Sequence, residues 1–141
     1  MEVNERLLWD IIEKSKFGTS NCEEQYNKLV KLINELPDSC VLKLRNIWDK
    51  ISLGYTRDYE FEKLHISNGG VVDGGDDTFY MDFGSWLVVQ GEELYKDFKN
   101  KGYKAVIDYI RVNNIDRNEY TFECMVYAFQ DVCKLKGIDY V

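Results

Sequence analysis

The chain has 141 residues, of which 45% are hydrophobic and 14% aromatic, so a sizeable core is expected and disorder is excluded. Acidic residues outnumber basic ones by 25 to 18, for a formal net charge of −7. This balance argues against nucleic acid or an anionic membrane as the partner, because phosphate binding needs a basic face. An acidic surface suits solubility or a basic protein partner.

The N-terminus lacks a basic segment followed by an apolar one, so no secretory signal is expected. No apolar run approaches the ~20 residues that cross a bilayer. The four cysteines, Cys22, Cys40, Cys124 and Cys133, form no C-x-x-C pair. Free and mostly buried thiols in a reducing compartment explain them best. We therefore expect a cytoplasmic protein.

The first half of the chain reads as amphipathic helices. Asn4 is expected to cap a helix that ends near Ser15. Asn21 and Glu24 have the spacing of a capping box, in which each side chain accepts from the backbone N–H of the other residue. The helix that follows has an apolar stripe at steps of four and three residues: Cys22, Tyr26, Leu29, Ile33 and Leu36.

A stop and a new start follow at Pro37, with Asp38 as the expected N-cap of a third helix. Its apolar side carries Val41, Leu44, Ile47, Trp48 and Ile51. Because the connection is short, the second and third helices are expected to pack as an antiparallel hairpin.

Later segments continue the helical pattern. Residues 56–66 are helical by composition, and a new apolar stripe begins at Thr78. It forms two helices, or one that bends near Gly91, because glycine weakens a helix. A short helix spans Tyr103 to Ile110, and the last is expected from about Asn118 to Lys136, with Gly137 as its stop. No segment alternates with period two. The prediction is a single all-α domain over 1–141, with about six to eight helices.

One stretch departs from this pattern. Between Asn68 and Gly91, two Gly-Gly pairs and three close aspartates, Asp73, Asp76 and Asp77, precede the apolar stripe. Glycine reaches backbone angles that other residues adopt only with strain, so the stretch indicates a shaped Gly/Asp-rich loop. Loops on a helical scaffold commonly carry function. The functional surface is therefore expected here.

Near this loop, Asp58, Glu62 and His65 share a face if residues 56–66 are helical. A carboxylate beside an imidazole suits a general base or a metal ligand. The alternative is that both carboxylates are solvated and His65 is half-buried. A cysteine–histidine nucleophile is disfavoured, because buried thiols are unreactive.

The aspartates of the loop have two interpretations. Carboxylate oxygens are ligands for Ca²⁺ or Mg²⁺, but the spacing of Asp73, Asp76 and Asp77 fails the EF-hand pattern. Alternatively, Asp76 or Asp77 caps the helix that starts at Thr78. The second interpretation is favoured, so no metal and no cofactor is expected.

Several motifs resemble a bacterial family catalogued as domain of unknown function 4240. The similarity covers nearly the whole chain, and the order of the motifs is kept. The motifs are Leu8-Trp9-x-x-Ile12-Glu13, Leu36-Pro37, Tyr55-Thr56-x-Asp58, Asn68-Gly69-Gly70, Asp76-Asp77-x-Phe79 and Phe83-x-x-Trp86-Leu87-x-x-Gln90-Gly91. The resemblance implies where the site is, and no established activity comes with it.

Two hypotheses follow. The first is a non-catalytic interaction module that binds a protein partner, with an immunity- or antitoxin-like role as one version. The second is a small-molecule-binding or hydrolytic domain that uses Asp58, His65, Asn68 and Asp77. Binding is favoured because known catalytic motifs are missing. The expected binding residues are Tyr55, Asp58, His65, Asn68, Gly69, Gly70, Asp76, Asp77, Trp86 and Gln90.

Overall fold

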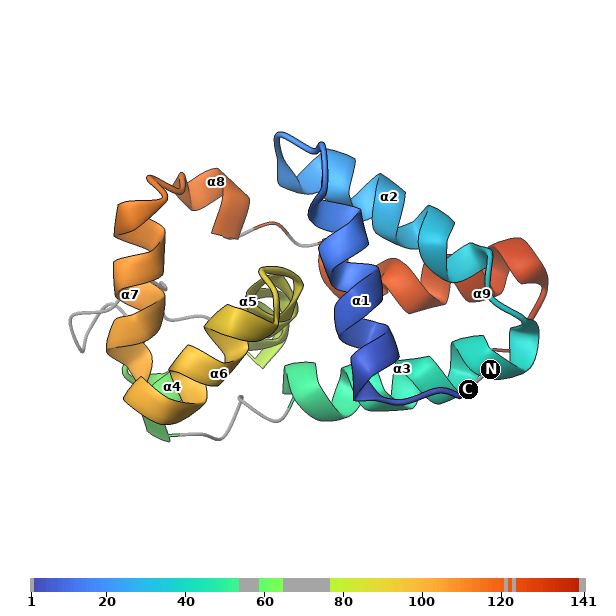
Figure 1. Ribbon diagram of the computed structural model, residues 1–141, viewed down its shortest axis with the longest axis horizontal. Coiled ribbons are helices and arrows are strands. Elements are labelled where there is room, and N and C mark those ends of the chain that lie inside the picture. The colour runs from blue at the N-terminus through green and yellow to red at the C-terminus, as the bar shows by residue number, and fades with distance from the viewer. Residues whose placement is uncertain (1, 54–58, 65–76, 121, 123, 140–141) are drawn as a thin grey trace.

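The computed structural model describes residues 2–53, 59–64, 77–120, 122 and 124–139. Every element in these ranges is a helix, so the all-α prediction is confirmed (Figure 1). The elements are α1 (Glu5–Lys16), α2 (Cys22–Asn34), α3 (Asp38–Leu53), α4 (Tyr59–Glu62), α5 (Asp77–Val89), α6 (Glu92–Lys101), α7 (Tyr103–Val112), α8 (Arg117–Tyr120), the 3₁₀ helix η2 (Cys124–Tyr127) and α9 (Ala128–Lys136). No described helix has both the length and the apolar character needed to cross a membrane.

The first two helices begin where their caps predict. The Asn4 side chain accepts from the backbone N–H of Leu7, and that of Asn21 accepts from Glu24 N at 2.9 Å. The reciprocal half of the capping box is wrong by one residue, because the Glu24 carboxylate accepts from Ser20 N instead of Asn21 N. The Glu24 side chain therefore still satisfies a backbone N–H just before the helix, that of Ser20.

The predicted hairpin of α2 and α3 is wrong. The helix α2 packs along α1 and α9, and α9 separates it from α3 (Figure 1). The main neighbour of α3 is α5. The expected cap is also displaced, because Asp38 is the first helical residue and accepts a hydrogen bond from Lys136 of α9 at 3.0 Å.

The helix α5 lies at the centre of the fold. It packs against α3, α6, α8 and η2, and in Figure 1 it lies between the group α1, α2, α3, α9 and the group α4, α6, α7, α8. Its residues from Asp82 to Val89 are all buried. Gly84 allows the close approach to α3, since a Cβ there would lie 2.6 Å from the Ser52 carbonyl oxygen. A third of the segment Asn68–Gly91, which was expected to carry function, is therefore core.

The chain turns sharply after α5. Gly91 has a φ of +121°, which other residues rarely adopt, and it separates α5 from α6. This confirms two helices as opposed to one bent helix. Gly102, with a φ of +83°, makes the next turn into α7. The α7 helix ends two residues later than the expected Ile110.

The expected C-terminal helix from Asn118 to Lys136 is wrong, because this region consists of α8, η2 and α9. The reason is tertiary packing: α8 and η2 contact α5, whereas α9 packs on α2 and α3. One straight helix could not cover both surfaces. Gly137 ends α9 in the left-handed conformation, as predicted.

Candidate functional site

Most of the expected binding residues lie outside the described ranges. These are Tyr55, Asp58, His65, Asn68, Gly69, Gly70 and Asp76. The predicted pairing of Asp58 with His65 therefore also lies outside the described residues, as does Asp73 of the loop. Asp77 is the first residue of α5, so it is helical and does not occupy the position before the helix. The remaining two residues, Trp86 and Gln90, are described, and both line a cavity.

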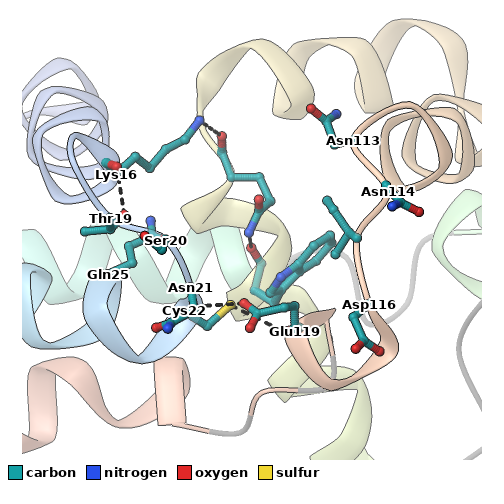
Figure 2. Close-up of a pocket in the computed structure, with 13 residues that line it drawn as sticks. Lys16, Thr19, Ser20, Asn21, Cys22, Gln25, Asn113, Asn114, Asp116 and Glu119 are labelled. Carbon is teal, nitrogen blue, oxygen red and sulfur yellow. Dashed lines mark hydrogen bonds between the residues drawn. The ribbon is translucent and has the colours of Figure 1, made fainter.

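This cavity has a volume of about 370 Å³. Three parts of the chain meet there: the α1–α2 connection with the first turn of α2, the C-terminal part of α5, and the α7–α8 connection (Figure 2). A volume of this size is sufficient for a small ligand or for one large side chain. The lining residues are Lys16, Thr19, Ser20, Asn21, Cys22, Gln25, Trp86, Gln90, Asn113, Asn114, Ile115, Asp116 and Glu119.

Cys22 and Glu119 join two of these segments. The Cys22 backbone N–H donates to Glu119 Oε2 at 2.8 Å, and its thiol donates to the Glu119 carbonyl oxygen at 3.4 Å. Burial raises the pKa of the Cys22 thiol strongly, the interaction with Glu119 raises it further, and Trp86 acts in the opposite direction. The thiol is therefore protonated near neutral pH, where it is a hydrogen-bond donor and a poor nucleophile.

Gln25 forms part of the cavity wall and is only 6% exposed. Its Nε2 donates to the Val89 carbonyl oxygen at 2.8 Å and to Ser15 Oγ at 3.2 Å. The Ser15 hydroxyl gives its own proton to the Ile12 carbonyl, so both partners of the Gln25 amide are acceptors. This fixes the orientation of the carboxamide. Its oxygen accepts no hydrogen bond from any described residue.

Gln90 connects this cavity to a second one of about 300 Å³. Its backbone carbonyl accepts from Lys16 Nζ at 2.5 Å, and its side-chain oxygen accepts from the Tyr109 hydroxyl at 3.1 Å. The second cavity shares Lys16, Gln90 and Asn113 with the first and adds Glu13, Glu93, Leu94, Asp97 and Tyr109. Burial, followed by the charges of Glu13 and Glu93, raises the pKa of Tyr109.

The sequence analysis did not identify the α7–α8 connection as part of a site. Asn114 has a φ of +51°, a left-handed conformation that asparagine tolerates, and it turns the chain after α7. Asp116 Oδ1 then accepts from Asn118 N at 3.3 Å. The signal was present as the polar pair Asn113-Asn114 after an apolar helix, but such a pair also marks an ordinary turn.

Two large apolar side chains flank the cavity in sequence. Phe17 follows the lining residue Lys16 and is 80% exposed, and Val112 precedes the lining residue Asn113 and is 83% exposed. Side chains of this kind commonly contribute to protein interfaces. Phe17 directly follows α1, whereas Val112 is the last residue of α7 and lines a separate hollow with Ala105 and Tyr109.

Within the described residues, no group of three or more histidine, cysteine, aspartate or glutamate side chains is placed to hold a metal ion. The cysteines there are free; Cys22, Cys40 and Cys133 are buried, and Cys124 is exposed.

No family model matches the chain, and neither a curated protein nor a solved structure matches it.

Proposed function

We propose that this chain is a non-catalytic interaction module that binds a protein partner at the cavity formed by α2, α5 and the α7–α8 connection. This surface includes Trp86 and Gln90 from the Asn68–Gly91 region expected from the sequence. The observation that carries the proposal is an open polar cavity whose lining residues Lys16 and Asn113 are each next in the chain to an exposed apolar residue, Phe17 and Val112. Polar groups that set specificity beside apolar contact area are the usual composition of a protein interface.

The chemistry of the cavity favours binding over catalysis. Its thiol, Cys22, has a raised pKa, so it lacks the activation that a nucleophile needs. The polar atoms of Thr19, Asn21 and Gln90 are used to hold the local structure together. Such a wall is preorganised to present a fixed set of hydrogen-bonding groups to a partner.

The net charge of −7 supports a partner with a basic surface. Complementary charge speeds association and rejects partners of the same sign. An immunity- or antitoxin-like role is one version of this proposal, since such proteins act by covering a partner. The chemistry on which the proposal depends is an acidic, polar surface that meets a basic protein.

The test is capture of partners from the native lysate with the full-length chain, followed by hydrogen exchange on the purified complex. The expected footprint covers residues 16–25 and 113–119. Phe17→Ser and Val112→Ser should each weaken the complex. Leu135→Ser is the matched control, because Leu135 on α9 is 69% exposed and lies outside the cavity. A footprint that avoids both connections, or equal weakening by all three variants, would overturn the proposal.

A further inference from the structure

The cavity lined by Gln25 includes a side-chain acceptor to which no described residue donates. The Gln25 carboxamide oxygen belongs to a side chain that is 6% exposed, and no described residue donates to it. This oxygen is not among the fully buried unpaired side-chain atoms of the described residues, so it keeps some solvent contact and a donor in the cavity can reach it. Because its amide nitrogen is fixed by Val89 and Ser15, the side chain cannot rotate to satisfy this oxygen internally.

Two carboxylates of the same wall add negative charge. Asp116 and Glu119 line the cavity, and neither forms an ion pair with any residue in the described ranges. Lys16 is the cation among the lining residues, but its ammonium is held by the Gln90 carbonyl oxygen. The neighbouring cavity contributes three more carboxylates, those of Glu13, Glu93 and Asp97. A cationic donor is the complementary ligand for this wall.

The distribution of the acceptors selects among cations. Gln25, Asp116 and Glu119 come from different helices and connections, and the cavity volume of about 370 Å³ exceeds the space that one ammonium needs. A guanidinium has five N–H donors in a planar fork and can therefore bond several separate acceptors at once. Trp86 forms part of the same wall, and its ring is held in the core by those of Phe83 and Tyr120.

Resting on the proposed function, we propose that this cavity binds the guanidinium group of an arginine side chain presented by the protein partner. The Gln25 oxygen and the carboxylates of Asp116 and Glu119 accept its N–H donors. Phe17 and Val112 then contact the surface of the partner around that arginine.

The direct test uses Nα-acetyl-arginine amide as the probe with the full-length ¹⁵N-labelled chain. The expected result is a saturable shift of the Gln25 side-chain amide and Trp86 indole resonances. The citrulline analogue has the same shape without the charge, and it should bind about tenfold or more weakly, because charge-assisted hydrogen bonds are the stronger ones. Equal binding of the two probes, or no shift at these resonances, would overturn the inference.

Two variants distinguish binding at a specific site from nonspecific electrostatic attraction to an acidic protein. Asp116→Asn keeps an acceptor for Asn118 N and should weaken arginine amide binding by about tenfold, the usual size for one lost charged contact. Glu23→Gln is the matched control, because Glu23 is exposed on α2, outside the cavity, and loses the same charge. It should leave binding unchanged. Equal weakening by both variants would refute a specific site.

The two proposals fail in different ways. A complex footprint elsewhere on the molecule would remove the protein-binding function while arginine amide still bound the cavity. Conversely, the arginines of the partner that lie at the cavity can be replaced by glutamine. A footprint that still covers the cavity after this replacement would refute the guanidinium inference alone. The expected result is that one such arginine substitution in the partner weakens the complex about tenfold or more.

Discussion

Glu119 completes the first turn of α2 from 97 residues further along the chain, because its Oε2 accepts from the Cys22 backbone N–H at 2.8 Å. The Asn21 side chain accepts from Glu24 N in the same turn. The free N–H groups at the start of a helix need such partners, and the negative charge also suits the helix dipole. The contact thereby joins α8 to the first turn of α2, and both residues line the cavity.

Removal of this contact should cost stability. Glu119→Ala is expected to lower the free energy of unfolding by about 1 kcal/mol, the typical value for a lost helix cap. Glu119→Gln should cost less, because the amide oxygen can still accept the hydrogen bond. Urea denaturation of the three proteins measures both differences. Equal stability of the alanine variant and the unmodified chain would show that the contact does not hold α2 in solution.

The buried thiol of Cys22 predicts how stability depends on pH. Burial raises the pKa of this thiol in the folded protein, so the folded state retains a proton that the unfolded state releases near pH 8.5. The stabilising contribution is complete below that pH and is lost as the pH rises above it. Burial also raises the pKa of Tyr109 and Cys133, which acts in the same direction.

The free energy of unfolding should therefore fall between about pH 8 and about pH 10. Cys22→Ala should make this fall smaller, and a slope that the substitution leaves unchanged would contradict the assignment. Alkylation gives an independent check. In the folded protein iodoacetamide should modify the exposed Cys124 and spare Cys22, whereas in urea it should modify both.

Trp48 is a core residue, as its position in the stripe of the third helix predicted. It is 2% exposed, and its ring lies 5.7 Å from that of Phe129 on α9, centroid to centroid. Trp48→Ala should lower the free energy of unfolding by about 3–5 kcal/mol through lost contacts and the cavity left behind. Leu135→Ala, at an exposed position of α9, serves as the control. An unchanged melting curve for Trp48→Ala would refute the core assignment.

Local features of the fold could be predicted from the sequence, and long-range pairings could not. Asn4 and Asn21 accept hydrogen bonds from backbone N–H groups three residues ahead, and Gly137 adopts the left-handed conformation that ends a helix. These effects are local, so the sequence was sufficient to predict the helix ends. The helix α9 packs between α2 and α3 and so separates them. Its contact with α3 through Lys136 and Asp38 joins residues 98 positions apart in the chain. No local pattern encodes which helix fills that space.

The same distinction explains the candidate site. Trp86 and Gln90 follow the unusual Gly/Asp-rich stretch, and for this reason they were predicted to be binding residues. Their neighbours in the cavity come from both sides of that stretch in the chain, and the contacts that assemble them, such as Lys16 to Gln90, span 74 residues. Because residues such as Asn113 and Thr19 read as ordinary turn formers, nothing in their local context indicated a shared site.

Gly84 and Ser85 are adjacent on α5, and we predict opposite effects for alanine at these two positions. Helix propensity alone favours Gly84→Ala by about 1 kcal/mol. However, the new Cβ would lie 2.6 Å from the Ser52 carbonyl oxygen, a backbone atom that cannot move without displacing α3. The expected result is a net destabilisation of about 1–3 kcal/mol, the usual cost of overpacking.

Ser85→Ala tests the neighbouring position with a change of similar size. The Ser85 hydroxyl is wholly buried and has no hydrogen-bond partner among the described residues. Its removal leaves no group unpaired and eliminates the desolvation cost of the hydroxyl, so the free energy of unfolding should stay equal or rise by about 1 kcal/mol. Urea denaturation of both variants gives the comparison. If Gly84→Ala proved the more stable of the two, α3 and α5 would be further apart in solution than the structure places them.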